Sequence, residues 1–407
     1  MKILHSLIFN DSRYRGHLKF FLASYFFVLF NYPLIRAAST TMFFEEFGAK
    51  SSPIAWLLTV IVLSFAILLF NNFQARHSVQ KVLLWASMIS TLIFAASIFG
   101  VLSKIKYASY FAFIWKEIYI VLQVHLILAY ANNYFRKNEF KSIIGPVGAI
   151  GSIGGILGGL LTTYLSRQFG TMFVSWFSLF FVALPGILFL RTPELKGEGQ
   201  ETKESPLQTI NVPGIKGYVF HIALVVMLSQ FVINIADFKF NLAFENSIVS
   251  SSDRTAYLGT IYTWTNLISL ILQFVFLPFL LPRISERTLH LFIPLTYLIF
   301  LGGAGLSGIA AQTLLPVAIY YTYLKASDYS LFNAGKELLY QPLMPEQKYG
   351  AKYLTDMFVY RLAKALIAAV LIYLQTSFML NTMMTGFLIL WLILVIRIFG
   401  IHRRLFN

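Results

Sequence analysis

Long apolar segments recur along the whole chain, and short polar loops separate most of them. The hydrophobic pattern predicts twelve such segments, each close to the roughly 20 residues that an α-helix needs to cross the hydrocarbon core of a bilayer. The expected ranges are 18–40, 53–73, 82–103, 107–132, 142–165, 170–190, 218–243, 257–281, 289–309, 312–333, 350–375 and 380–397. The pattern therefore predicts an all-α polytopic membrane protein with twelve transmembrane helices.

One loop is much longer and more charged than the others. It covers residues 191–217 and contains the run RTPELKGEGQETKESP. This loop leaves six predicted spans on each side, a layout that many secondary transporters share. We therefore expect two pseudo-symmetric six-helix bundles, residues 1–190 and 218–407, joined by a linker over residues 191–217.

The composition excludes several classes of protein. Of the 407 residues, 57% are hydrophobic and only 12% are charged, whereas soluble domains carry about 25% charged residues. A disordered chain is polar and rich in charge, and a single membrane anchor would not extend apolar character from end to end. The chain has no cysteine, so disulfides, thiolate nucleophiles and cysteine-ligated metals are excluded.

The net charge of +15 has a simple explanation in the loops. Loops on the side of the N-terminus carry 21 lysine and arginine residues, and loops on the opposite side carry five. Because cytoplasmic loops of membrane proteins are enriched in these residues, we expect both termini and the linker in the cytoplasm. Nucleic-acid binding is not needed to explain the charge, and we expect none.

The fifth predicted span is rich in glycine. Gly151, Gly155 and Gly159 recur every four residues, as do Gly154 and Gly158. Missing side chains let helix backbones approach closely within lipid, so the repeat predicts a tight helix–helix seam, or a hinge in a seam that moves. No strand precedes the glycines, so they do not form a dinucleotide-binding fingerprint.

Charged residues inside the spans are the strongest functional signal. A charge in mid-bilayer costs about 2.5–3.5 kcal/mol even on the translocon-insertion scale, so such residues face protein or water. The charges concentrate on spans 1, 4, 7 and 10, the first helix of each three-helix unit, which predicts a shared polar cavity; span 11 is an exception. The residues are Arg36, Lys116, Glu117, Asp237, Lys239, Lys325, Asp328, Asp356, Arg361 and Lys364.

Pairing within a helix is the alternative to a functional role. Lys325 and Asp328 are three residues apart, and Lys352 and Asp356 are four apart, so each pair can meet on one helix face. Asp237 and Lys239 are two apart and need partners elsewhere.

The ten charges within the spans sum to +2. A surplus of basic groups in a cavity favours an anionic substrate, although carbonyl groups can also neutralise lysine and arginine.

Enzymatic function has little support. None of the seven histidines forms a close ligand pair, and no GxxxxGK[ST] loop is present. His125 is interpreted as a packed histidine. We expect no enzyme activity, no cofactor and no metal.

Three segments resemble the ATP/ADP translocase family, which has the major facilitator architecture. The clearest is GKELLYQPLMPEQKYGAKYLTDMFVYRLAK, residues 335–364. The second is NYPLIR, similar to a Tyr-x-x-x-Arg pattern at Tyr32 and Arg36. The third extends from Lys116 through ANNYFRKNEFKSIIGP. The positions that fit are Tyr32, Arg36, Glu117, Ala131, Asn132, Glu139, Lys141, Lys336, Glu337, Tyr340, Pro342, Leu343, Glu346, Lys348, Lys352, Asp356, Arg361 and Lys364.

The chain also departs from this family. The family's Asn-x-Lys-Asp run after the first-span arginine is replaced here by Ala37-Ala38-Ser39-Thr40, so a substrate-site lysine is missing. Asp237 replaces a glutamate in span 7, and Ala363 stands where the family usually has glycine. The resemblance implies a divergent bacterial member that acts in the inner (plasma) membrane.

These observations predict a secondary active transporter that moves nucleotides or a related phosphorylated anion by alternating access and exchange. The alternatives are a proton-coupled major facilitator transporter of an unrelated peptide, lipid or drug-like molecule, and a membrane-embedded enzyme or scaffold. Expected partners are the anionic substrate and the lipid bilayer, and the chain is expected to be a monomer. The expected substrate-binding residues are Tyr32, Arg36, Lys116, Glu117, Asp237, Lys239, Lys325 and Asp328. The expected gate of ion pairs comprises Lys336, Glu337, Lys348, Lys352, Asp356, Arg361 and Lys364.

Overall fold

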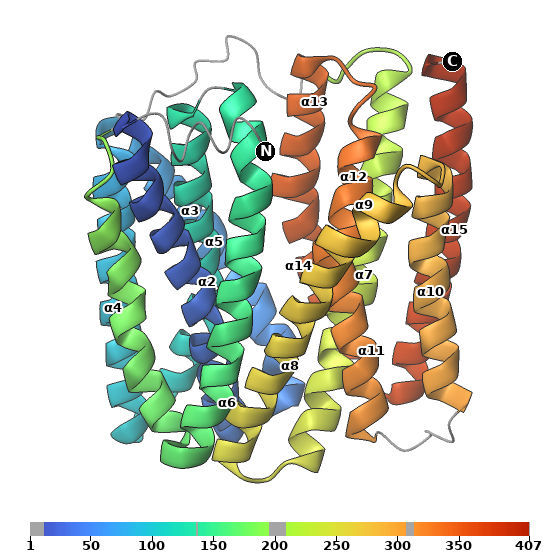
Figure 1. The fold of residues 1–407 in the computed structure, drawn as a ribbon. Coiled ribbons are helices and arrows are strands. Elements are labelled where there is room, and N and C mark those ends of the chain that lie inside the picture. Colours follow the sequence, from blue (N-terminus) through green and yellow to red (C-terminus); the bar gives the residue numbers. More distant parts are fainter. Residues whose placement is uncertain (1–11, 136, 195–208, 307–312, 407) are drawn as a thin grey trace. The chain divides into compact units, whose positions relative to one another are not determined.

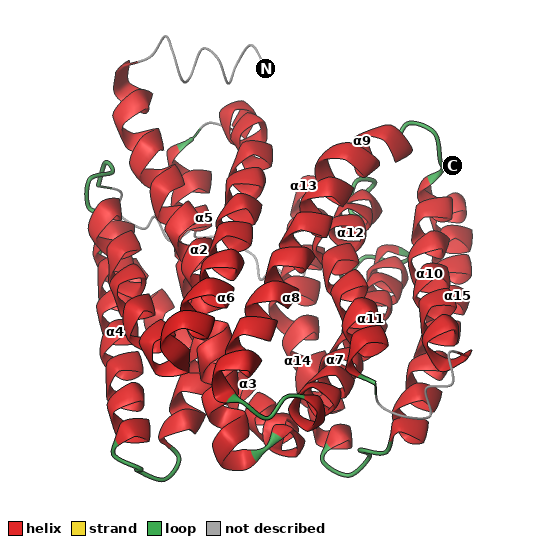
Figure 2. Ribbon diagram, turned by 60° about the horizontal axis from the view of Figure 1, so that its bottom comes forward, coloured by secondary structure: helices red, strands yellow, loops and turns green. Residues whose placement is uncertain are grey.

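The described part of the chain is built from helices. The computed structural model describes residues 12–135, 137–194, 209–306 and 313–406, and its regular elements there are all helical (Figure 2). Eight of its helices are long and apolar enough to cross a membrane. The predicted class, an all-α polytopic membrane protein, is confirmed, and the twelve crossings stay a prediction.

The chain forms two compact units, which are described separately. Unit 1 comprises residues 1–48, 61–199 and 248–267. Within it α2 packs against α5 and α6, and α4 packs against α5 and α6 (Figure 1). Its helices are α2 (Ser12–Phe47), most of α3 (Ser52–Arg76), α4 (Val79–Leu102), α5 (Ala108–Tyr134), α6 (Lys137–Phe189) and most of α8 (Ser251–Ile271).

Unit 2 comprises residues 49–60, 200–247 and 268–407. Its central helix is α7, which packs against α11, α14 and α15. Its helical elements are η1 (Ala49–Ser51), α7 (Ile215–Ser247), η2 (Leu272–Phe276), α9 (Leu277–Leu280), α10 (Glu286–Leu306), α11 (Leu314–Ser327), η3 (Asp328–Phe332), α12 (Asn333–Leu339), α13 (Pro345–Lys352), η4 (Tyr353–Val359), α14 (Tyr360–Leu371) and α15 (Ser377–Phe406).

The predicted division into residues 1–190 and 218–407 stays a prediction. Most of the linker, residues 195–208, lies outside the described residues, and so do the side chains of Glu139 and Lys141.

A glycine divides α6 into two helices. Gly170 has φ +86° and ψ 170°, a backbone conformation that interrupts the helix. Residues with a side chain rarely adopt such a positive φ, whereas glycine does so readily. The break falls at the predicted boundary between the fifth and sixth apolar segments.

The glycine repeat of α6 forms close contacts with two neighbouring helices of unit 1. A Cβ atom added at Gly158 would lie 1.9 Å from the carbonyl oxygen of Phe30 in α2. A Cβ atom at Gly159 would lie 2.7 Å from the carbonyl oxygen of Gly259 in α8, and one at Gly259 would lie 2.8 Å from the carbonyl oxygen of Gly159. The predicted tight seam is confirmed, because there is no room for side chains where these backbones meet.

Three short π-helical turns interrupt unit 2: η2, η3 and η4. Two of them contain a carboxylate that the sequence singles out, Asp328 at the first position of η3 and Asp356 within η4. A π-helical turn shifts the register of the residues that follow it and is common at functional sites. The predicted tenth and eleventh spans are therefore each interrupted near a charged residue.

Candidate functional site

Arg36 lies against aromatic rings in unit 1. Its guanidinium carbon lies 5.6 Å from the ring centre of Tyr32, one turn earlier on α2, and 4.9 Å from that of Tyr262 on α8. Arginine prefers such contacts because its planar charge is weakly hydrated and attracted to ring faces. Two expected substrate-binding residues, Tyr32 and Arg36, are thus together, and Tyr262 joins them.

Lys116 is enclosed within unit 1. Its side chain is 3% exposed, and its ammonium lies 3.7 Å from a carboxylate oxygen of Glu117. The ammonium also donates a hydrogen bond of 2.9 Å to the carbonyl of Phe113 and lies 3.2 Å from the centre of that ring. The partners Glu117 and Phe113 lie on the same helix as Lys116, α5. The carboxylate of Glu117 therefore compensates the buried positive charge locally.

Asp237 and Lys325 form an ion pair between α7 and α11 in unit 2. The Lys325 ammonium lies 3.4 Å from a carboxylate oxygen of Asp237, and each side chain is 13% exposed. The other carboxylate oxygen accepts a hydrogen bond of 3.2 Å from the Asn241 amide. Lys325 therefore has a cross-helix partner, in addition to the neighbour Asp328 that sequence spacing offered.

Lys239 has a neutral partner. Its ammonium donates a hydrogen bond to the side-chain carbonyl of Asn381 on α15, and its side chain is half-buried. The prediction that Asp237 and Lys239 need partners on other helices is correct. Among the described residues no carboxylate forms an ion pair with Lys239, so its positive charge is not cancelled locally.

Asp328 is buried in unit 2 with an unsatisfied oxygen. The residue is 8% exposed, and its Oδ1 atom has no hydrogen-bond partner among the residues that the structure describes. The ammonium groups of Lys325 and Lys336 both lie within electrostatic reach of its carboxylate. Asp328 thus combines deep burial with incomplete hydrogen bonding.

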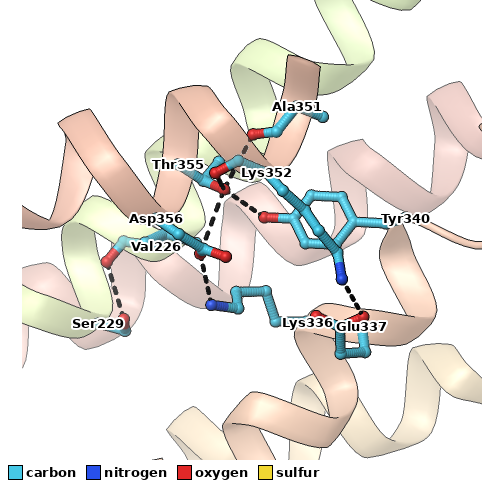
Figure 3. Close-up of polar contacts among 9 residues, drawn as sticks. All are labelled: Val226, Ser229, Lys336, Glu337, Tyr340, Ala351, Lys352, Thr355 and Asp356. Carbon is cyan, nitrogen blue, oxygen red and sulfur yellow. Dashed lines mark hydrogen bonds and ion pairs between the residues drawn. The ribbon is translucent and has the colours of Figure 1, made fainter. Parts of the chain in front are cut away.

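Two ion pairs join α12 to the segment that begins at α13, as Figure 3 shows. Lys336 lies 2.6 Å from Asp356, with its own side chain 8% exposed. Lys352 lies 2.7 Å from Glu337, where the side chains are 35% and 48% exposed. The spacing-based pairing of Lys352 with Asp356 is therefore wrong, since each residue pairs across to α12.

Tyr340 and Thr355 form a hydrogen bond between their hydroxyl groups beside these ion pairs (Figure 3). Burial raises the pKa of the Tyr340 hydroxyl well above its ordinary value, and the charge of Asp356 adds to this effect. The hydroxyl therefore stays neutral. Thr355 also donates to the carbonyl of Ala351, 3.0 Å away, which links the hydrogen bond to the backbone of α13.

The remaining predicted gate residues take no part in these two ion pairs. Lys348 and Arg361 are half-buried and form no ion pair within the described part of the chain. Lys364 lies 6.0 Å from the ring centre of Trp56. Of the seven predicted gate residues, four are therefore in ion pairs: Lys336, Glu337, Lys352 and Asp356.

Sequence reasoning did not identify three neutral residues that contact the charged groups. Tyr262 contacts Arg36, Asn241 binds Asp237, and Asn381 binds Lys239. Nothing in the local sequence distinguishes them from other polar residues of apolar helices. Among the described residues, no group of three or more histidine, aspartate and glutamate residues could hold a metal ion.

Comparisons with known proteins reveal a shared fold without detectable sequence similarity. No family model matches the sequence, and no curated protein matches it. A crystal structure of the POT family transporter PepTSo is similar with a TM-score of 0.68 and 13% identity, covering 95% of this chain and 98% of that chain.

Two further solved structures show the same similarity. A bacterial metal transporter has a TM-score of 0.65 and 13% identity, covering 96% of this chain and 99% of that one. The nucleoside transporter NupG has a TM-score of 0.61 and 12% identity, covering 94% and 98%. The chain therefore has the all-α, membrane-spanning fold found in these transporters, which agrees with the major facilitator architecture expected from the sequence.

Proposed function

We propose that this chain is a secondary active transporter that moves a nucleotide or another phosphorylated anion by alternating access, most simply by exchange. The likeness to transporter structures extends over nearly the full length of both chains, which supports transport. One of those proteins is a nucleoside transporter and another is a metal transporter, so the fold alone does not select a substrate. The substrate class in this proposal rests on the charged residues.

The proposal that the substrate is an anion rests mainly on Lys239. Its ammonium is half-buried on a membrane helix and is held by the neutral amide of Asn381. The amide dipole of Asn381 carries no opposite net charge, so a negatively charged ligand near the Lys239 ammonium would gain from Coulomb attraction. The surplus of two positive charges among the span residues points the same way.

Arg36 is the anion contact that we propose within unit 1. Its guanidinium carbon lies 5.6 Å from the ring centre of Tyr32 and 4.9 Å from that of Tyr262, and arginine is suited to bidentate contact with phosphate oxygens. The sequence segments similar to the ATP/ADP translocase family make adenine nucleotides the first candidates. In this proposal the protein acts in a bacterial inner membrane with both termini in the cytoplasm.

Exchange in proteoliposomes tests this function. Vesicles that contain the purified protein are loaded with ADP, and entry of radiolabelled ATP is compared with entry into vesicles loaded with buffer. We expect ADP to accelerate entry and Lys239→Gln to reduce it, because the charge is lost. Lys216→Gln, at an exposed position of the same helix, is the matched control.

A proton-coupled transporter of an unrelated solute is the second candidate. Asp328 favours it, because its carboxylate is buried with an oxygen that lacks a hydrogen bond among the described residues. Uptake of a peptide or drug-like solute driven by a pH gradient, with no response to ATP or ADP, would select this candidate over the first.

A further inference from the structure

Five charged side chains of unit 2 are linked in a row. Lys325 lies 3.4 Å from Asp237, and Lys336 lies 2.6 Å from Asp356. The carboxylate of Asp328 lies within electrostatic reach of both lysines. We call these five residues the charged row. Its members come from five elements: α7, α11, η3, α12 and η4.

The charged row contains one more acid than base. With all five groups ionised, three carboxylates face two ammonium groups, which leaves one negative charge. The Asp356 side chain is 39% exposed, so water solvates its charge. At Asp328, which is 8% exposed, an uncompensated charge is costly, and such a group commonly binds a proton instead. The charge of the row would therefore balance with one proton bound.

Asp328 is the member that lacks full compensation. Asp237 has both Lys325 and Asn241 as partners, and Asp356 has Lys336. Asp328 is the most buried of the three, at 8% exposed, and its Oδ1 atom is without a hydrogen bond among the described residues. A protonated carboxyl is neutral and tolerates this environment, whereas an ionised one needs more hydrogen bonds.

The other groups that face Asp328 do not supply the missing charge. Tyrosines on α10 and α14 lie within electrostatic reach of its carboxylate, and both are neutral donors at ordinary pH. The charged groups that act on Asp328, Lys325 and Lys336, are already members of the charged row. The titratable groups around Asp328, from each element packed against it, are Asp237, Tyr297, Lys325, Lys336, Asp356 and Tyr360.

We propose that Asp328 binds and releases one proton in each transport cycle and so couples substrate movement to a proton gradient. The site deepens the proposed function and rests on it. With the proton bound, Lys325 and Lys336 are free to pair with Asp237 and Asp356, which is the arrangement observed. When the proton leaves to water, Asp328 becomes a third carboxylate that competes for two lysines, which weakens the α7–α11 and α12–η4 ion pairs.

The position of Asp328 suits such a role. It is the first residue of the π-helical turn η3, and turns of this kind are frequent at functional sites. A change in ion pairing at this point acts on both α11 and α12, which precede and follow the turn. Protonation can therefore bias the segment that carries both Lys325 and Lys336.

Infrared spectroscopy tests proton binding without any substrate. Spectra of the purified wild-type protein at acidic and alkaline pH are subtracted, and the carboxylic-acid band of a buried group is followed. We expect Asp328→Asn to remove one such band, and Asp253→Asn, at an exposed carboxylate of α8, to leave it. An unchanged band in Asp328→Asn overturns the proposal. If that variant does not fold, Asp328→Glu must shift the band, and an unshifted band overturns the proposal equally.

Transport then tests coupling, with radiolabelled ATP as the probe. We expect a pH gradient to drive ATP accumulation by the wild type and by Asp253→Asn, the exposed control, and Asp328→Asn to lose the response to the gradient. Exchange by the wild type without any response to the pH gradient, or a response to a sodium gradient alone, overturns proton coupling and leaves the proposed function intact. Absence of ATP exchange by the wild type contradicts the proposed function, and the infrared result then decides the proton site by itself.

Discussion

Asp237 and Lys325 join the middle of α7 to α11 through an ion pair of 3.4 Å in which each side chain is 13% exposed. The contact is made between two helices that also pack against each other. An ion pair so far from water gains much from its Coulomb attraction, and each partner depends on the other for charge compensation. Asn241 supports the pair by donating a hydrogen bond to Asp237.

We predict that loss of either partner destabilises the protein and that loss of both is less harmful than the sum. Asp237→Asn or Lys325→Gln alone leaves a buried charge unpaired, which typically costs about 3–5 kcal/mol. The double variant removes both charges and restores part of that loss. Thermal unfolding in detergent gives the three values, with Asp253→Asn as a control for an exposed carboxylate. Strictly additive losses would show that the two side chains do not depend on each other.

The glycine seam of α6 gives a second prediction. Gly158→Ala places a methyl group where the carbonyl oxygen of Phe30 lies 1.9 Å away, so α2 and α6 must separate. We expect a loss of about 3 kcal/mol or more, as for severe overpacking. Gly386→Ala on α15 is the control, because no atom lies within 4 Å of its added Cβ. That control should gain up to about 1 kcal/mol, since alanine favours helix over glycine. Equal unfolding temperatures for the two variants would contradict the prediction.

The sequence predicts the helices of this protein well and its long-range contacts poorly. The length of an apolar segment can be read from consecutive residues alone. The helix break at Gly170 accordingly falls at the boundary that the hydrophobic pattern predicts between the fifth and sixth segments. Ion pairs depend on which helices pack together, and linear spacing offered Lys325 with Asp328 and Lys352 with Asp356. The structure adds Asp237 as a cross-helix partner of Lys325 and pairs Lys352 with Glu337. The residues on either side of the π-helical turns η3 and η4 have ordinary helical backbone angles. The hydrophobic pattern of the sequence runs through these turns without a break and does not predict them.

Glu337 and Lys352 provide a third prediction, on conformational balance. Their ion pair is 2.7 Å long but largely exposed, and such pairs contribute no more than about 1 kcal/mol to stability. We therefore expect Glu337→Gln to leave the unfolding temperature nearly unchanged. If the pair acts as a gate, the variant changes the ratio of inward-open to outward-open molecules, as measured by spin labels on α12 and α13. Glu346→Gln, at an exposed position of α13, is the control. An unchanged ratio and unchanged transport would show that the pair is not a gate.

Lys116 gives a fourth prediction, because its role as a substrate contact conflicts with its burial. The side chain is 3% exposed and is held by Glu117 and the carbonyl of Phe113. We expect Lys116→Met combined with Glu117→Gln to fold and to keep most of its affinity for ATP, since the pair is removed as a unit. Lys116→Met alone leaves Glu117 without this partner and should be less stable than the double variant. If the double variant folds but loses ATP binding, Lys116 contacts substrate in another state of the transport cycle.

Substitution of Arg36 tests whether the substrate is an anion. Its guanidinium carbon lies 4.9 Å from the ring centre of Tyr262 and 5.6 Å from that of Tyr32. These two ring contacts restrict where the guanidinium can lie. If the guanidinium binds phosphate, Arg36→Gln removes a charged contact, and such truncations typically cost about 2–5 kcal/mol of binding free energy. Arg36→Lys keeps the charge and loses the paired hydrogen bonds, so it should bind with intermediate affinity.

Binding of ATP to the purified protein, measured by calorimetry, ranks the wild type, Arg36→Lys and Arg36→Gln in that order. Arg167→Gln, at an exposed position of α6, removes an equal charge away from this site and should match the wild type. Thermal unfolding of each variant separates a loss of binding from a loss of fold. Equal affinity in all four proteins would assign Arg36 a purely structural role beside Tyr262. A transported substrate that proves to be cationic would contradict the charge argument for Arg36 and Lys239 together, because both residues would then repel it.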